Sequence, residues 1–434
     1  MTRFVKRLLA TTCLALGMTS AAKADIWIAE NHWNSAYEAG FPEWVRTNFG
    51  KDAFHKPEDK ALFGLALDCS DAIYAMRIIY AYQHKLPFEI NDPRNGKILS
   101  NKFKKWDGFR EKRRHENDDG TWETYEGPEF TETDKLRAFI NFVGDITSTI
   151  NLAQDTYPVA LEDVQPGDMF LLPRNHAYIV KDIDPTGAMT TLSHSSPRAW
   201  RVMAEINDFP AEVPTDKRKR DGYRRFKPHK YLRKSAMSVP GASDEQWNIS
   251  RSLGGDREAF KLATQTALAS IKEPMSAKAE RLFYSLCDYT SQRVDIVNQS
   301  LSYLDNINYN SGRQCMTFGE YAEYSTPGRD KKLGGQFKLL RALTQNPDWQ
   351  NEGFQLKPII EAIFDPSDAM SDQEIGSYCA VPFDIRGGRQ ITLREIWRGL
   401  DAGRMVADPH APLDSRWGLS REPWTPHCKS ATRS

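Results

Sequence analysis

"LALDCSDAIYAMRIIYAYQ", residues 65–83, is largely apolar and holds a single cysteine near its start. Its apolar side chains recur every three or four residues, at Ala72, Met76, Ile79 and Tyr80. This period predicts a helix with one buried face. Asp68 stands directly before Cys69 and is of the residue type that caps helices. The sequence therefore predicts a buried helix whose first residue is Cys69.

Further along the chain, the spacing of the apolar residues changes from a helical period to strand-like alternation. An amphipathic helix is predicted near 133–153, and short strand-like runs follow it, at 166–173, 176–184 and 188–196. The sequence Asp184-Pro185-Thr186-Gly187 predicts a turn between the last two runs. Helices followed by consecutive strands are typical of an α+β fold. We assign residues 25–235 to one such domain, with a polar insertion at 91–155.

The C-terminal half has a helical pattern. Residues 233–246 resemble a linker, and an amphipathic helix is predicted over 276–305. Thr392 and Glu395 have the spacing of a capping box. We assign 240–434 to a mainly α-helical domain without a catalytic constellation. Its role stays open, and binding a protein partner is one expectation for it.

The N-terminus has the composition of a secretory signal peptide. Residues 1–24 begin with basic residues, continue with a short apolar run and end in Ala22-Lys23-Ala24. We expect cleavage before Asp25 and a periplasmic or secreted protein without a membrane span. Residues 1–24 hold four basic residues and no acids, so their removal leaves 54 basic against 58 acidic residues. This balance gives no electrostatic reason to expect nucleic-acid binding.

One cysteine of the expected mature chain lies apart from the other four in the sequence. Removal of the signal peptide leaves Cys69 alone in its half, and the other four lie in the C-terminal half, at Cys287, Cys315, Cys379 and Cys428. In an oxidising compartment these four can form up to two disulfides in any of three pairings. No CxxC or HExxH spacing is present in the sequence. We therefore expect no metal and no cofactor, and Cys69 is the thiol that needs an explanation.

A cysteine that begins a helix lies where the helix dipole favours the thiolate. Asp68 and Asp71 oppose this effect, because nearby negative charge raises the pKa of a thiol. A nearby imidazole would have to outweigh the two acids. The chain has nine histidines, and only His176 and His194 lie on the predicted strands.

The position of the turn decides whether the two histidines meet. A hairpin centred on Pro185 places His176 directly opposite His194 on one face of the sheet. A hairpin centred between Pro185 and Thr186 offsets them by one residue and points them to opposite faces. The sequence leaves both registers open.

Four motifs in order resemble the NlpC family of cell-wall cysteine peptidases. They are "DCS" at the helix start, "VQPGDMFLL", "HAYIV" and "LSHSS". The resemblance covers roughly residues 60–200 and implies a papain-like α+β fold. It implies Cys69 as nucleophile, His176 as general base and acid, and His194 as the residue that orients it. It also implies a peptidoglycan or muropeptide substrate, cleaved in the stem peptide between D-Glu and the diamino acid.

The chain departs from the family pattern near the nucleophile. Asp71 stands where the family has glycine, and the segment before Cys69 has no tyrosine, only Phe63. We expect Asp68, Ser70 and Asp71 to contact substrate, with Asp71 facing a cationic amine. The alternative is a catalytically inactive papain-like scaffold that binds wall fragments or a protein partner.

Overall fold

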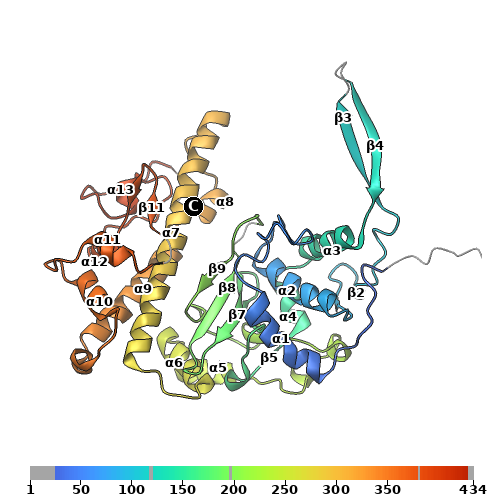
Figure 1. Cartoon of the computed structure of the whole chain (residues 1–434), viewed down its shortest axis with the longest axis horizontal. Coiled ribbons are helices and arrows are strands. Elements are labelled where there is room, and N and C mark those ends of the chain that lie inside the picture. The colour runs from blue at the N-terminus through green and yellow to red at the C-terminus, as the bar shows by residue number, and fades with distance from the viewer. Residues whose placement is uncertain (1–24, 117–120, 195–197, 380–381, 429–434) are drawn as a thin grey trace, which may run out of the picture.

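A computed structural model describes residues 25–116, 121–194, 198–379 and 382–428. The expected signal peptide, 1–24, lies outside the described residues. In Figure 1 one sheet lies between the N-terminal helices and the helices of the C-terminal half. Helices and a six-stranded antiparallel sheet occur together, so the α+β class is confirmed.

The central sheet has the strand order β5-β10-β6-β7-β8-β9, and every neighbouring pair is antiparallel. Its strands are β5 (Thr156–Pro158), β6 (Met169–Leu172), β7 (His176–Ile183), β8 (Met189–Ser193), β9 (Ala204–Ile206) and β10 (Gly222–Phe226). The three strand-like runs of the sequence correspond to β6, β7 and β8. Their short apolar segments are separated by turns, which is why they could be located from the sequence.

The hairpin of β7 and β8 has the offset register in its half nearest the histidines. Ile179 pairs with Leu192 and Val180 with Thr191, and the register shifts between Val180 and Asp182. Extending the pairing outward from Ile179 and Leu192 places His194 opposite Ala177. The histidines are therefore not directly opposed, and a β-bulge rather than the turn alone sets their offset.

Four helices cover one face of the sheet. They are α1 (Ser35–Asn48), α2 (Cys69–Gln83), α3 (Glu132–Ile146) and α4 (Thr149–Asp155). Residues 69–81 of α2 are all buried, since this helix packs against α1, α3 and β7. The single helix predicted over 133–153 is wrong. The chain breaks at Thr147–Ser148, where the Ser148 hydroxyl accepts a hydrogen bond from the Ile150 N–H and begins α4.

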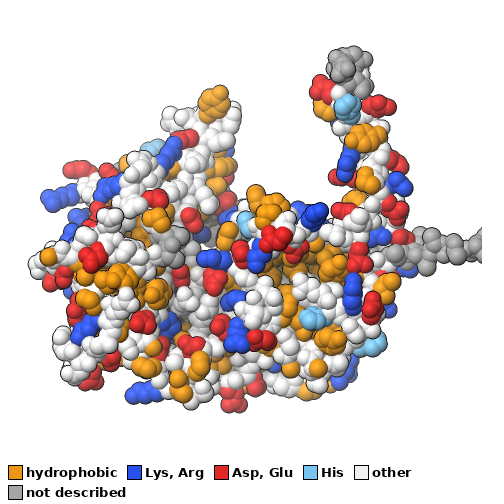
Figure 2. Space-filling model, in the orientation of Figure 1, with side chains coloured by type: hydrophobic (Ala, Val, Ile, Leu, Met, Phe, Trp, Pro, Cys, Tyr) orange, Lys and Arg blue, Asp and Glu red, His pale blue; other side chains and the backbone are white. Residues whose placement is uncertain are grey.

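The predicted insertion contains two separate hairpins before α3. The first, β1 (Glu89–Asn91) with β2 (Ile98–Ser100), lies against the core. The second, β3 (Arg110–Glu116) with β4 (Trp122–Glu129), projects as an arm (Figure 1). Every side chain of β3 is exposed, and Figure 2 shows acidic, basic and apolar side chains mixed along the arm. This polar pattern explains why the arm leaves the core.

The opposite face of the sheet is covered by α5 (Glu245–Ser252) and α6 (Arg257–Leu268). Val239, in the predicted linker, is buried in the same hydrophobic cluster as Tyr178 and Phe260. The packing therefore joins α5 and α6 to the sheet. The described chain also contains short 3-10 helices: η1 (Leu161–Asp163), η2 (His229–Tyr231), η3 (Ala236–Ser238) and η4 (Pro347–Asn351).

The C-terminal helices form a second hydrophobic cluster around the long helix α7. They are α7 (Met275–Ser311), α8 (Phe318–Tyr324), α9 (Pro327–Thr344), α10 (Lys357–Phe364), α11 (Asp372–Gly376), α12 (Leu393–Asp401) and α13 (Leu413–Arg416), with a small hairpin of β11 (Asp384–Ile385) and β12 (Arg389–Gln390). The capping box of Thr392 and Glu395 is confirmed at α12. Across the described ranges, no helix is both long enough and apolar enough to cross a bilayer.

Two disulfides fasten these helices. Cys287 pairs with Cys379 and Cys315 with Cys428. The expected pair of bonds is confirmed, and the structure selects one of the three pairings that the sequence left open. Cys69 is the free cysteine of the described chain.

Candidate active site around Cys69

Cys69 is the first residue of α2, and its side chain is buried, with 3% exposed. The helix start faces β7, and the backbone of Ala177 hydrogen-bonds the thiol. Burial and then the charge of Asp68 raise the pKa of the Cys69 thiol to about 12, although the backbone hydrogen bonds from Ala177 and Ser70 lower it. The resting sulfur is therefore a neutral thiol at neutral pH.

The two aspartates beside Cys69 form a complete capping box. Asp68 Oδ1 accepts hydrogen bonds from the Ser70 N–H at 2.8 Å, the Asp71 N–H at 3.0 Å and the Ser70 hydroxyl at 2.9 Å. Asp71 Oδ2 accepts from the Asp68 N–H at 3.0 Å. Asp68 Oδ1, Asp71 Oδ2 and the Ser70 hydroxyl are thus hydrogen-bonded within the helix start. Their contact with substrate stays a prediction.

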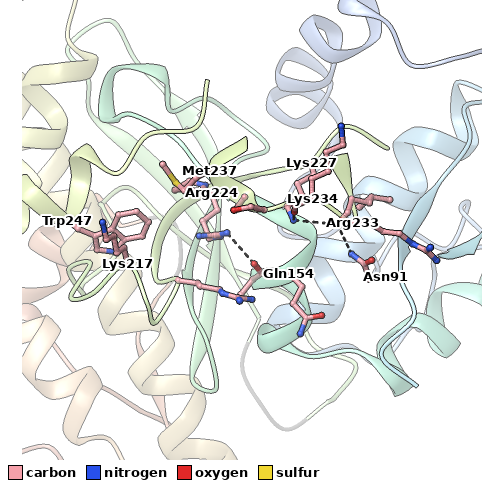
Figure 3. A pocket seen from close by; sticks show the side chains of 15 residues that line it. Asn91, Gln154, Lys217, Arg224, Lys227, Arg233, Lys234, Met237 and Trp247 are labelled. Carbon is pink, nitrogen blue, oxygen red and sulfur yellow. Dashed lines mark hydrogen bonds between the residues drawn. The ribbon is translucent and has the colours of Figure 1, made fainter. Parts of the chain in front are cut away.

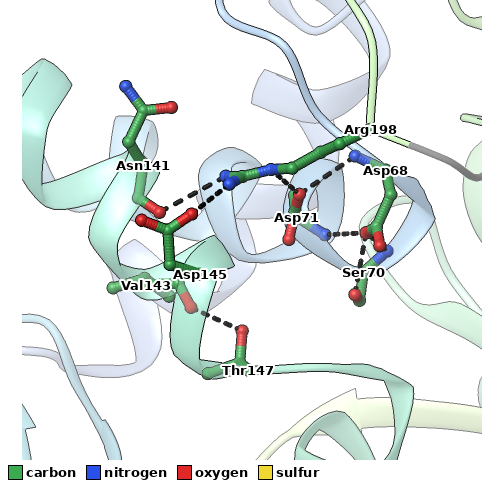
Figure 4. A network of polar contacts seen from close by, with 8 residues as sticks. All are labelled: Asp68, Ser70, Asp71, Asn141, Val143, Asp145, Thr147 and Arg198. Carbon is green, nitrogen blue, oxygen red and sulfur yellow. Dashed lines mark hydrogen bonds and ion pairs between the residues drawn. The ribbon is translucent and has the colours of Figure 1, made fainter.

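Arg198 completes this network from the loop after β8 (Figure 4). Its Nε donates to Asp71 Oδ2 at 2.6 Å, and its guanidinium also pairs with Asp145 of α3. A Cβ on Gly144 would collide with both the Arg198 guanidinium and the Asp71 carboxylate, so a larger residue here would displace this ion pair. Burial and the charge of Asp68 raise the pKa of Asp71 to about 6, while Arg198 lowers it.

His176 is the first residue of β7 and lies on the face of the strand that carries Tyr178. The two rings meet edge to face, with centroids 4.6 Å apart. Burial, with the positive charges of Lys332 and Arg329, lowers the pKa of His176 to about 4, while Asp68 raises it. The imidazole is therefore neutral at neutral pH and is a weak base in this resting state.

His194 follows the last residue of β8 and is almost fully buried, with 2% exposed. Its Nε2 lies 3.1 Å from the carbonyl oxygen of Arg201. A carbonyl only accepts, so this contact assigns the proton to Nε2. His194 is close enough to His176 to lower its pKa by charge repulsion.

The structure brings Cys69, His176 and His194 to one end of the sheet without pairing the thiol and the first imidazole. Ala177 belongs to the cluster that packs against α2, whereas Tyr178 belongs to the cluster on the other face. Because side chains alternate along a strand, His176 shares the side of Tyr178. Among the hydrogen bonds of the described residues, none joins Cys69 to His176.

The sequence interpretation missed the cations beside His176. Lys332 of α9 donates from Nζ to the Tyr178 hydroxyl at 3.0 Å. Arg329 lies three residues earlier in the same helix. Both belong to the C-terminal half, to which no site residue had been assigned. Their positions depend on how α9 docks against the sheet, so no local pattern in the sequence could have identified them.

The described part of the chain has no group of three or more His, Cys, Asp or Glu side chains suited to hold a metal ion. The chemistry that the site can offer is that of a thiol, two imidazoles and backbone N–H groups. Ser70 and Asp71 N–H groups are occupied by the Asp68 side chain. Of the amides that begin α2, the Cys69 N–H makes no hydrogen bond to any described residue.

The raised pKa predicts slow alkylation of Cys69. At pH 8 a thiol with a pKa of about 12 holds roughly a hundred to a thousand times less thiolate than one at the ordinary value of 9.0. Iodoacetamide should therefore react that much more slowly with the folded protein than with the urea-unfolded, non-reduced protein. The rate in the folded protein should keep rising with pH beyond 9, as monitored by mass spectrometry. Equal rates in the two states would contradict the raised pKa.

Comparison with known proteins gives no relative for this chain: no family model, curated protein or solved structure matches it.

Proposed function

We propose that this protein is an exported cysteine peptidase or amidase with a papain-like catalytic half, acting on peptidoglycan stem peptides. The observation that supports the proposal is the placement of Cys69 at the start of a buried helix, against the strand that begins with His176. His194 lies at the adjoining end of β8. Nucleophile, base and orienting residue come from the elements that the family resemblance implies.

The proposed reaction begins with both partners neutral. The resting imidazole of His176 lies on the Tyr178 side of β7, so the proposed reaction requires it to turn toward Cys69 when substrate binds. The Cys69 sulfur then attacks the amide carbonyl while its proton passes to the His176 imidazole, and the C–S bond forms. The imidazolium then protonates the leaving amine, the C–N bond breaks and a thioester remains. Water hydrolyses the thioester to release the acid. The Cys69 N–H, which is free among the described residues, is suited to stabilise the oxyanion.

The cations beside His176 supply a reason for an anionic substrate. Lys332 and Arg329 lower the pKa of His176. A substrate carboxylate that pairs with them would neutralise this repulsion and make His176 a stronger base. Stem peptides carry such carboxylates, and the bond from D-Glu to the diamino acid stands next to one. Substrate binding would then activate the base only when the correct peptide is present.

A second candidate function is a scaffold that binds wall fragments or a protein partner without cleaving. The observation that favours it is the buried, neutral thiol, whose pKa is raised to about 12. The resting His176 is not hydrogen-bonded to it within the described chain. In this case the helical C-terminal half would provide the partner surface.

Digestion of purified sacculi separates the two candidates. The mature protein should release stem-peptide fragments with a new carboxyl terminus at D-Glu, identified by mass spectrometry. Fragments that end at another stem-peptide amide would support the peptidase proposal and would assign cleavage to a different bond. Sedimentation of the protein with sacculi without any release would contradict the peptidase and support the scaffold.

A further inference from the structure

We propose that a basic cavity at the β5 edge of the sheet binds a soluble ligand that carries two or more phosphates. The cavity has a volume of about 470 Å³ and lies between β5, β10, the end of α4 and the segment 227–237 (Figure 3). Six of its lining side chains are basic, and none of the described residues that line it is acidic. The six are Lys217, Arg220, Arg224, Lys227, Arg233 and Lys234.

Arg224, which lines the cavity, is a buried cation that no carboxylate pairs directly within the described residues. It is 1% exposed, and its hydrogen bonds go to neutral groups: the Thr156 hydroxyl at 2.8 Å, the Thr156 carbonyl at 2.8 Å and the Ala153 carbonyl at 3.2 Å. Among the described residues it forms no salt bridge, and its Nη1 makes no hydrogen bond. A buried charge is costly unless it is paired, so an anion in the cavity would stabilise this arrangement.

Arg225, the next residue of β10, is a cation that is paired within the protein. Arg225 pairs with both oxygens of Asp168, at 2.7 and 2.8 Å. Arg224 points to the other face of the strand and has no such partner within the described chain. Burial and repulsion from Arg220 lower the pKa of Arg224 to about 9, while the charge of Asp221 raises it. The contrast along one strand indicates that the charge of Arg224 is left for a ligand.

Lys227 is the second buried cation of the cavity. It is 7% exposed, and its Nζ donates to the carbonyl oxygens of Lys234 at 2.9 Å and Leu232 at 3.5 Å. These carbonyls hold the ammonium in place without neutralising it. The charge of Asp155 raises the pKa of Lys227, as that of Asp221 raises the pKa of Arg224, but neither cation forms a salt bridge within the described residues. An anion in the cavity would therefore contact two buried cations that no carboxylate pairs directly.

Four exposed cations complete the rim from two loops: Lys217, Arg220, Arg233 and Lys234. Lys217 lies 3.5 Å from Asp244, and the other three form no salt bridge within the described residues. Residues 217–220 form an exposed turn. Lys217 and Arg220 of this turn line the cavity together with Arg233 and Lys234. Several cations within about 470 Å³ match a ligand that concentrates negative charge, as linked phosphates do.

Isothermal titration of the full mature protein with inorganic tripolyphosphate, at constant ionic strength, tests the site. The double variant Arg220→Ala/Arg233→Ala removes two rim cations and should weaken tripolyphosphate binding about tenfold, because each guanidinium offers charge-assisted hydrogen bonds to a phosphate. The matched variant Lys219→Ala/Lys230→Ala removes the same charge from exposed residues of the same segments that do not line the cavity. Its dissociation constant for tripolyphosphate should stay within about twofold of the wild-type value.

Three results would overturn the proposal. One is the absence of tripolyphosphate binding to the wild type at millimolar concentration. Another is equal weakening in both double variants, which would show general surface electrostatics instead of a site. The third is cosedimentation with phosphatidic-acid vesicles that Arg220→Ala/Arg233→Ala abolishes while tripolyphosphate fails to compete. That outcome would assign the cavity to a lipid headgroup instead of a soluble ligand.

Discussion

Cys69→Ala is expected to abolish the release of stem-peptide fragments from sacculi, with a loss of roughly a thousandfold or more in rate. In the proposed reaction the sulfur forms the covalent bond to the substrate, and no described side chain next to it offers a second nucleophile of that kind. Loss of the nucleophile in hydrolases that work through a covalent intermediate costs factors of about 10³ to 10⁶. The measurement is the rate of fragment appearance by mass spectrometry.

The control must show that the fold of Cys69→Ala is intact. Cys69 is small and buried, so alanine removes one sulfur atom, and the melting temperature should change little. His176→Ala should lose activity to a similar degree, because the reaction then lacks its base. His115→Ala is the matched histidine control, since His115 lies exposed on the projecting arm. A Cys69→Ala protein that retained half of the wild-type rate would rule out the proposed nucleophile.

The parts of the site that could be predicted are those that local sequence determines. Asp68 and Asp71 lie three residues apart and form the capping box that begins α2 at Cys69. The turn at Asp184–Gly187 joins β7 and β8 because Asp184 accepts hydrogen bonds from the turn and Gly187 adopts a positive φ of 74°. Each of these features depends on a few neighbouring residues, so the sequence contains the necessary information.

The parts that could not be predicted depend on distant contacts. The register of the histidines is set by a bulge between Val180 and Asp182, which no turn signal marks. Lys332 reaches Tyr178 only because α9 packs behind the sheet. The pairing of four cysteines in two disulfides likewise depends on the arrangement of the C-terminal helices.

The two aspartates beside Cys69 have a different meaning in the structure. From the sequence they oppose a thiolate, and the charge of Asp68 does raise the pKa of Cys69. The capping box also directs the Asp71 N–H to the Asp68 carboxylate and shares the Ser70 N–H with it, although the Ser70 N–H still lowers the pKa of the thiol. The helix start is therefore built to keep the thiol neutral. The proposed reaction therefore starts from a neutral thiol and a general base, and not from a resting thiolate–imidazolium ion pair.

The Asp71–Arg198 pair should be the strongest polar contributor to the stability of this helix start. Arg198→Met is expected to lower the free energy of unfolding by about 2–4 kcal/mol at pH 8, because it leaves a buried carboxylate without its cation. The side chain of Asp71 is 2% exposed and that of Arg198 is 29% exposed, so water reduces the loss below that of a fully buried pair. Urea unfolding followed by circular dichroism measures the change.

The pH dependence of this loss identifies its cause. The pKa of Asp71 in the folded protein is about 6, above its ordinary value of 3.8, and it should rise further without Arg198. A carboxyl group with a raised folded pKa is stabilising while protonated and loses that stability as the pH rises through the folded pKa. The deficit of Arg198→Met should therefore be largest at pH 8, shrink as the pH falls toward 6 and be small below pH 6.

A double-mutant cycle with Asp71→Asn completes the test. The Arg198→Met/Asp71→Asn protein should be more stable at pH 8 than Arg198→Met alone, because the amide carries no charge that needs a partner. Arg46→Met is the matched control, since Arg46 pairs with Glu43 on the surface and should cost less than about 1 kcal/mol. A loss for Arg198→Met that is independent of pH and is not relieved by Asp71→Asn would instead assign the role of Arg198 to packing against α3.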